Sequence, residues 1–152
     1  MLFLFLAALW SAAEGRVQPR AAVSAWRRVQ RGGAHVLHAE NLGQFEMMTE
    51  FDVGPETVVI IDFGAGWCGP CRSIAPQFEA LAAEYAPIMA CSAADRASVF
   101  VKVDVDENRE ASARFNVASL PTFVVLVGGV EVARVVGADM NKLKKVVSGL
   151  VK

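Results

Sequence analysis

The stretch that decides the fold runs from Thr57 to Cys71 and reads Thr-Val-Val-Ile-Ile-Asp-Phe-Gly-Ala-Gly-Trp-Cys-Gly-Pro-Cys. Its first part, Thr57 to Gly64, is a continuous run rich in β-branched residues, which is typical of a central strand buried on both faces. Cys68 and Cys71 follow that strand, where the chain turns into a helix. We therefore expect the chemistry of this protein at the end of its most buried strand.

The spacing of the two cysteines favours redox chemistry. Residues i and i+3 on one helical turn are close enough to form a disulfide. At the helix start, Cys68 would meet free backbone N–H groups and the positive end of the dipole, which stabilise thiolate over thiol. This predicts Cys68 as the nucleophile and Cys71, shielded one turn inside, as the resolving cysteine. A structural disulfide closing so short a loop would add little stability.

Half a zinc site is the competing interpretation of this pair. Zinc needs four ligands, and the other candidates are Cys91, His35 and His38. On a strand, His35 and His38 would point to opposite faces, so we predict no metal site.

Strand and helix patterns alternate along the rest of the chain. This order predicts an α/β fold with a central mixed β-sheet and helices on both faces. We expect strands at 35–37, 57–64, 99–105, 122–127 and 130–136, with a Gly128-Gly129 turn between the last two. We expect helices at 41–51 with Asn41 as N-cap, at 74–85 with a kink at Pro76, at 107–115 and at 141–151.

Composition excludes several classes of protein. The chain has 152 residues, 54% of them hydrophobic, and a net charge of −1. One domain is expected at this length, and the apolar content is too high for a disordered chain. No stretch approaches the roughly 18 apolar residues of a membrane span. The balanced charge gives no footprint for nucleic acid, and three cysteines are too few for a disulfide-stapled scaffold.

Residues 1–34 are predicted to be an N-terminal targeting leader, cleaved or disordered. Met1 to Trp10 is an uncharged apolar run before Ser11-Ala12-Ala13, which suits a signal peptidase. Residues 15–39 hold five arginines and no acid, which suits an organellar transit peptide. We expect an organellar protein, with the mitochondrion favoured over the secretory pathway. An uncut extension, and a cytoplasmic location if the leader is unused, are the alternatives.

The motifs in order resemble the thioredoxin family over about residues 35–152. The most specific is Trp67-Cys68-Gly69-Pro70-Cys71, preceded by Ile61-Asp62-Phe63 and followed by Ile74-Ala75-Pro76. Ser119-Leu120-Pro121-Thr122 matches the family's loop with a cis proline, and Lys102-Val103-Asp104-Val105-Asp106 and Val136-Gly137-Ala138 fit the same template. The resemblance implies the thioredoxin fold and the activity of a protein-disulfide reductase.

The resemblance also gives a role to Asp62. Because this carboxyl lies in an apolar strand, we expect it to be desolvated, with a raised pKa. The resemblance implies that it passes a proton to or from Cys71, directly or through a water. A strand end that faces solvent is the alternative. Lys102 is the expected charge partner of Asp62, or else a lysine that reaches out to solvent.

Five further residues are implied to tune the site or to contact substrate. Pro70, beside Gly69, stiffens the turn between the cysteines and should favour the reduced dithiol. Trp67 and Pro121 are implied to contact substrate, with the backbone beside Pro121 pairing with an extended segment. Gly137 either keeps this rim flat for docking or only ends a strand.

Two departures from the family pattern matter for the site. Gly64 stands where relatives often carry a bulky aromatic side chain, so we expect a looser wall beside the cysteines. Residues 86–98 form a predicted loop about ten residues longer than the family needs, and we expect its Cys91 to be a bystander thiol.

The implied partners are a flavoprotein thioredoxin reductase that draws on NADPH, and clients such as peroxiredoxins or methionine sulfoxide reductases. The chain itself is expected to be a monomer that binds no cofactor and does not insert stably in a membrane. A secretory-pathway disulfide oxidase or isomerase is one alternative. The other is a binding module whose redox pair is incidental, which would need neither Asp62 nor Pro121.

Overall fold

The computed structural model describes residues 36–51, 55–85 and 98–151. The predicted leader at 1–34, His35, Cys91 and nearly all of the predicted long loop lie outside these ranges. Within them, no helix is long and apolar enough to cross a membrane.

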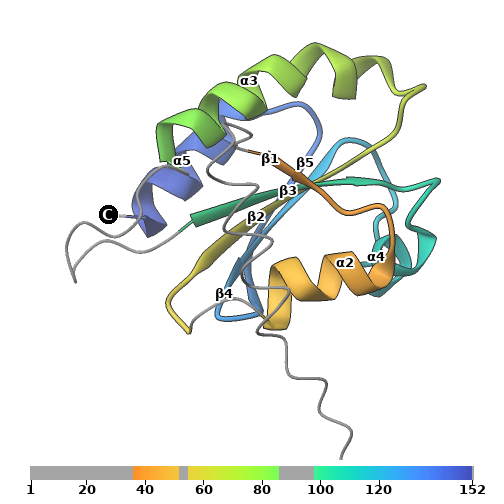
Figure 1. Ribbon diagram of the computed structural model, residues 1–152. Coiled ribbons are helices and arrows are strands. Elements are labelled where there is room, and N and C mark those ends of the chain that lie inside the picture. The colour runs from red at the N-terminus through yellow and green to blue at the C-terminus, as the bar shows by residue number, and fades with distance from the viewer. Residues whose placement is uncertain (1–35, 52–54, 86–97, 152) are drawn as a thin grey trace, which may run out of the picture.

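Five strands form one mixed sheet in the order β1-β3-β2-β4-β5 (Figure 1). The first three in this order run parallel, and β4 and β5 are antiparallel to their neighbours. The central strand β2 is buried at all seven positions, as its apolar run predicts. The strands are β1 (Val36–His38), β2 (Val58–Gly64), β3 (Ser98–Asp104), β4 (Thr122–Val127) and β5 (Val130–Val136).

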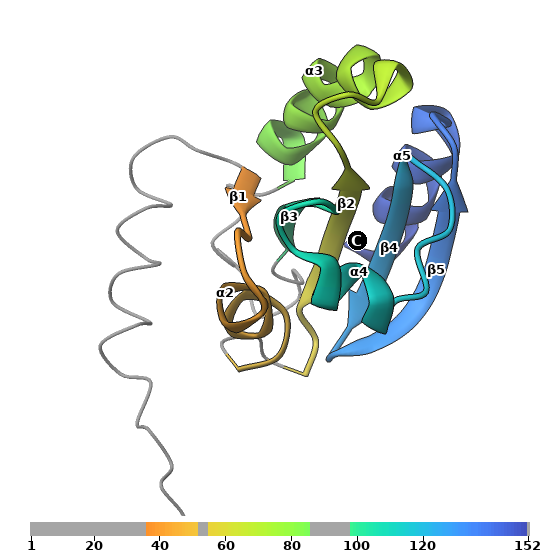
Figure 2. The ribbon, with the colours of Figure 1, turned by 90° about the vertical axis from the view of Figure 1, so that its right-hand side faces the viewer.

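Helices cover both faces of the sheet, which confirms the predicted architecture (Figures 1 and 2). Helices α3 (Gly69–Tyr85) and α5 (Met140–Leu150) pack on one face. Helices α2 (Leu42–Glu46) and α4 (Arg109–Arg114) pack on the other face. A π-helical turn, η2 (Met47–Phe51), continues α2.

The two faces of β2 hold separate halves of the core. Val58 and Ile60 pack under α3 and α5, whereas Val59, Ile61 and Phe63 pack under α2 and α4. Side chains alternate between the faces of a strand, so Asp62 follows Ile60 onto the α3 face. Alternation thus places one carboxyl beneath the helix that carries the cysteines.

Helix boundaries differ from the predictions more than strand boundaries do. Helix α3 begins at Gly69, five residues before the predicted Ile74. Pro70 is compatible with this start because first-turn N–H groups have no partner within a helix. Pro76 lies inside the helix. Asn41 caps α2 as predicted, since its side chain accepts a hydrogen bond from Gln44 N at 2.9 Å.

The turn between β4 and β5 depends on its two glycines. Gly128 and Gly129 both have positive φ, at 56° and 81°. A Cβ added at Gly128 would lie 2.6 Å from the backbone oxygen of Pro55, whereas one added at Gly129 would meet nothing within 4 Å. Both positions therefore require the left-handed region, but only Gly128 is also closed by the neighbouring backbone.

Gly128→Ala should consequently destabilise the protein more than Gly129→Ala. The left-handed conformation costs each alanine about 1 kcal/mol, and the clash with Pro55 adds about 1–3 kcal/mol at position 128. Urea unfolding of both variants measures the difference. Equal losses of stability would show that the Pro55 backbone moves away without cost.

Candidate active site

The two cysteines lie where the chain leaves β2 and enters α3. Cys68 and Cys71 form a disulfide with their Cα atoms 5.3 Å apart. The N–H of Cys71 donates a hydrogen bond to Cys68 Sγ at 3.2 Å, and the N–H of Cys68 donates to the oxygen of Ala65 at 3.1 Å. Cys68 therefore precedes the first turn of α3, and its sulfur receives one of the free N–H groups there.

This arrangement favours negative charge on Cys68 because, as predicted, this residue lies at the start of a helix. A backbone N–H and the positive end of the α3 dipole both act on its sulfur. Burial does not separate the two cysteines, because Cys68 is 5% and Cys71 6% exposed. Cys71 is shielded as expected, but in the disulfide form Cys68 is buried as well, because both pack with Ala65, Val105 and Leu120. The position at the helix start is therefore what distinguishes Cys68.

Asp62 has a buried carboxyl on the face of the sheet that α3 covers. It is 1% exposed, and its Oδ1 has no hydrogen-bond partner among the described residues. Burial raises the pKa of Asp62 from 3.8 to about 6, and the positive charge of Lys102 opposes this rise. The alternative of a solvent-facing strand end is therefore wrong, and the raised pKa predicted from the apolar strand is confirmed.

Lys102 is the neighbour of Asp62 across the sheet. The two residues are register partners in the parallel pairing of β2 with β3. Lys102 also lines an open cleft at the sheet edge, together with His38, Ala39, Glu40, Asp104 and Glu107. Lys102 therefore acts on the buried carboxyl as its charge partner and also borders the open cleft.

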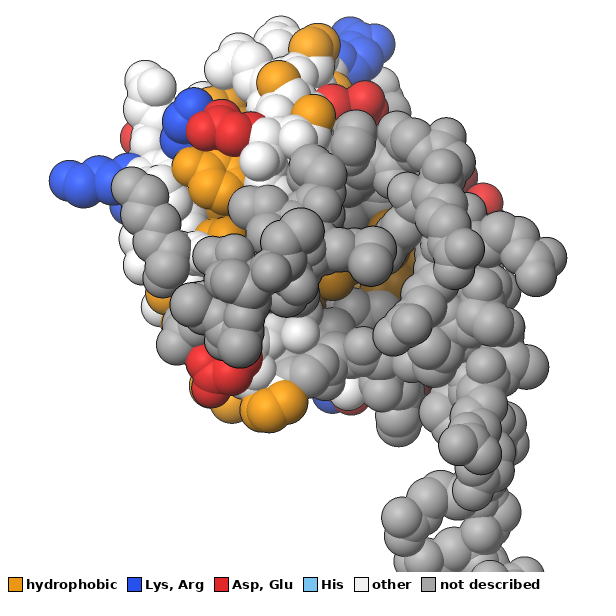
Figure 3. Space-filling model, turned by 60° about the vertical axis from the view of Figure 1, so that its left-hand side comes forward, with side chains coloured by type: hydrophobic (Ala, Val, Ile, Leu, Met, Phe, Trp, Pro, Cys, Tyr) orange, Lys and Arg blue, Asp and Glu red, His pale blue; other side chains and the backbone are white. Residues whose placement is uncertain are grey.

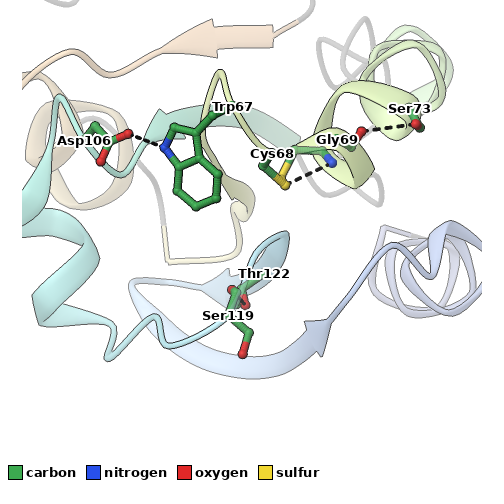
Figure 4. Close-up of a disulfide and its surroundings, with 8 residues drawn as sticks. Trp67, Cys68, Gly69, Ser73, Asp106, Ser119 and Thr122 are labelled. Carbon is green, nitrogen blue, oxygen red and sulfur yellow. Dashed lines mark hydrogen bonds between the residues drawn. A yellow bond between two sulfur atoms is a disulfide. The ribbon is translucent and has the colours of Figure 1, made fainter.

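Trp67 has a partner that the sequence reasoning missed. Its indole is 70% exposed, and its Nε1 donates a hydrogen bond to Asp106 Oδ2 at 2.7 Å (Figure 4). The N–H of Asp106 in turn donates to Asp104 Oδ1 at 2.9 Å. The Asp-x-Asp spacing at the end of β3 is the available signal, since such a side chain folds the backbone into a turn.

The predicted cis-proline loop faces the cysteines. The Leu120–Pro121 peptide bond is cis, and Leu120 packs against Ala65, Cys68 and Cys71. Thr122 Oγ1 donates to the oxygen of Ser119 at 2.7 Å, and both residues lie opposite Cys68 in Figure 4. A segment about 50 residues downstream of the cysteines in the sequence is thereby brought to them.

Gly137 directly follows β5 beside this loop. Its N–H donates to the oxygen of Pro121 at 2.8 Å, and its φ is 92°. The positive φ supports the strand-end interpretation and also leaves the rim without a side chain there, so the two interpretations are compatible.

The glycines around the disulfide differ in which atoms a side chain at each position would contact. A Cβ added at Gly64 would lie 3.6 Å from Cys71 Sγ and 4.0 Å from Asp62 Oδ1. One added at Gly66 or Gly69 would meet nothing within 4 Å. Gly69 and Pro70 are exposed between the cysteines. Position 64 therefore adjoins Cys71 at ordinary contact distance, and the looser wall expected there stays a prediction.

The described surface carries mixed charge. On the face in Figure 3, acidic and basic side chains are interspersed among the residues that are coloured. Among residues 36–51, 55–85 and 98–151, no three His, Cys, Asp or Glu side chains are grouped to hold a metal ion.

Comparison with known proteins gives a consistent assignment. The sequence model of the family "Thioredoxin" matches residues 44–149. The chain is 43% identical over 94 residues to Thioredoxin H2-2 of Oryza sativa subsp. japonica, a match that covers 62% of this chain and 63% of that protein. It is 40% identical over 112 residues to Thioredoxin H-type of Oryza sativa subsp. indica, which covers 74% and 84%.

A solved structure agrees with these matches and confirms the predicted fold. Thioredoxin NaTrxh from Nicotiana alata superposes with a TM-score of 0.68 and 30% identity, covering 78% of this chain and 95% of that one. The fold, the paired cysteines and the matched residues lead to one conclusion: the chain belongs to the thioredoxin family, whose members are thiol–disulfide oxidoreductases.

Proposed function

We propose that this protein reduces disulfides in client proteins and is itself re-reduced by a flavoprotein thioredoxin reductase that draws on NADPH. One observation carries this proposal. The sulfur of Cys68 receives a helix N–H at 3.2 Å, and Asp62, whose pKa burial raises to about 6, lies on the face of β2 beneath α3, the helix that carries Cys71. A module that only binds partners has no use for an acid–base group at that place.

The reaction takes two exchange steps. The Cys68 thiolate attacks one sulfur of the client disulfide, forms a mixed disulfide and expels the other client sulfur as a thiolate. Cys71 then gives its proton to the Asp62 carboxylate and attacks Cys68 Sγ, which expels the second client thiolate. Two electrons pass to the client, and the Cys68–Cys71 disulfide forms. The reductase returns two electrons to that disulfide.

The rim around the disulfide suits an extended client segment. Trp67 offers an exposed indole held by Asp106, and the loop at Pro121 lies opposite Cys68. Gly137 leaves the third side without a side chain. We propose that the client backbone pairs beside Pro121, as a strand added to the sheet would. Peroxiredoxins and methionine sulfoxide reductases are the proposed client classes.

A secretory-pathway oxidase or isomerase is the second candidate function, favoured by the apolar run Met1 to Trp10. The two candidates differ in the direction of exchange. Insulin reduction with dithiothreitol supports a reductase, whereas faster oxidation of a reduced client by the disulfide form supports the oxidase.

We propose the mitochondrion as the location, because residues 15–39 carry five arginines and no acid. Residues 1–34 fused to a fluorescent protein should direct it to mitochondria, and replacing the five arginines by glutamine should abolish this. Delivery of the fusion to the endoplasmic reticulum would instead support the secretory alternative.

Trapping of clients tests the two cysteine roles. Cys71→Ser should accumulate mixed disulfides with client proteins, because Cys68 still attacks but nothing expels the client. Cys68→Ser should trap almost none, and Cys91→Ser should match the unmodified protein. Non-reducing gels of a cell extract provide the measurement. Equal trapping by Cys68→Ser and Cys71→Ser would overturn the assignment.

The buried carboxyl predicts a pH-dependent stability. Between pH 4 and 6 the folded protein holds a proton on Asp62 that the unfolded chain has released, so stability falls as pH rises through this range. The rise in pKa corresponds to about 3 kcal/mol above pH 6. Asp62→Asn should therefore match the unmodified protein near pH 3.5 and exceed its stability by up to about 3 kcal/mol at pH 7.5.

Urea unfolding at the two pH values measures this difference, and insulin reduction by the same variant measures the role in catalysis. Turnover should fall most near neutral pH, while alkylation of Cys68 by iodoacetamide continues. A stability gain of the same size at both pH values would show that Asp62 does not ionise in the folded protein.

A further inference from the structure

Neither the backbone nor the packing requires glycine at position 66. Gly66 lacks the positive φ of Gly128, and a Cβ added to it would meet nothing within 4 Å. Gly66 and Trp67 are the central residues of a turn, which the hydrogen bond from Cys68 N to the oxygen of Ala65 closes at 3.1 Å. The open space next to Trp67 therefore results from the absence of a side chain at position 66.

The indole that adjoins this space is both exposed and fixed. Trp67 has the largest exposed fraction of the large apolar side chains in the described part of the chain. Its Nε1 donates to Asp106 Oδ2 at 2.7 Å, and a bond to this N–H leaves both faces of the ring uncovered. Because the indole is already held in place, a client side chain that packs on it has less ordering to offset.

The loop opposite the indole also presents apolar groups. Leu120 packs against Cys68, and Val136, the β5 partner of Thr122, is 59% exposed. In Figure 4 the indole of Trp67 lies beside Cys68, while Thr122 lies opposite it. A client side chain next to the attacked disulfide therefore meets apolar surface on two sides of Cys68.

We propose that Gly66 is a specificity-determining residue, whose missing side chain lets a client lay a large apolar side chain, adjacent to its disulfide, on the face of Trp67. This inference rests on the proposed reductase function and names the class of client that the function favours. The indole supplies the contact area, and Gly66 keeps the approach to it open. A side chain at position 66 would occupy that approach, so clients with large flanking residues would lose more rate than clients with small ones.

Cystine peptides that differ only beside the disulfide test this inference. Phenylalanine, arginine or glycine stands on both sides of each cysteine, and the reduced protein is mixed with each peptide in excess. Each second-order rate constant is divided by that of dithiothreitol with the same peptide, which removes the intrinsic reactivity of the disulfide. The phenylalanine peptide should react about two- to tenfold faster than the glycine peptide, which is the range that an aromatic contact contributes.

Substitutions at position 66 test whether this residue sets the preference. Gly66→Leu should lower the ratio of the phenylalanine rate to the glycine rate to about one, and Gly66→Ala should give an intermediate ratio. Gly149→Leu is the matched control and should keep the ratio, because a Cβ there also meets nothing within 4 Å and the residue lies in the last turn of α5. A loss of rate common to all peptides would leave the ratio unchanged and count against the inference.

Each contrary result has a distinct meaning. An unchanged or higher ratio in Gly66→Leu would overturn the role of Gly66. An arginine peptide that reacts faster than the phenylalanine peptide would show that the indole attracts cations, and would overturn the apolar class of client. The proposed function stands in both cases as long as the unmodified protein reduces the glycine peptide. If it reduces none of the peptides, the proposed function fails and this inference fails with it.

Discussion

The pairing of β2 with β3 on one side and β4 on the other is the constraint on which the site depends. This register places Asp62 next to Lys102 and Phe123. A shift by one residue would turn Asp62 to the opposite face and bring an apolar side chain under α3. The same strand ends at Gly64, so the chain reaches Cys68 where α3 begins. Register therefore fixes both the acid–base group and the redox pair.

The buried carboxyl costs stability, and the core beneath α3 offsets that cost. Phe78 of α3 lies 5.5 Å from the ring of Phe100 and 5.8 Å from that of Phe123. These contacts hold the helix down on the face that contains Asp62. Phe123 links the helix to the carboxyl, because it packs against Phe78 and is also the β4 partner of Asp62. The aromatic contacts thus keep the carboxyl desolvated and keep the helix above it.

Strands and the cysteine pair were predictable because each is encoded locally. The β-branched run before Gly64 predicts a strand from a few consecutive residues, and Gly128-Gly129 predicts a tight turn in the same way. Helix α3 begins before its predicted start, because apolar spacing begins at Ile74 whereas the helix begins at Gly69, within the cysteine motif. The bond between Trp67 and Asp106 joins residues 39 apart, so the local Asp-x-Asp spacing indicates a turn but not the partner of Asp106. Long-range polar pairs of this kind become visible only once the sheet brings the loops together.

Because Cys68 and Cys71 are equally buried, their chemical difference must come from the groups that each sulfur faces. The sulfur of Cys68 accepts a hydrogen bond from the N–H of Cys71 in the first turn of α3, and this N–H and the helix dipole favour its thiolate. The sulfur of Cys71 lies toward Gly64, on the strand that carries Asp62. Helix α3 thus favours negative charge on the sulfur of Cys68, whereas strand β2 carries the carboxyl proposed to take up the proton of Cys71. Only the short connection 65–68 separates these two elements. The different surroundings of the two sulfurs therefore follow from the point where the central strand is joined to the helix.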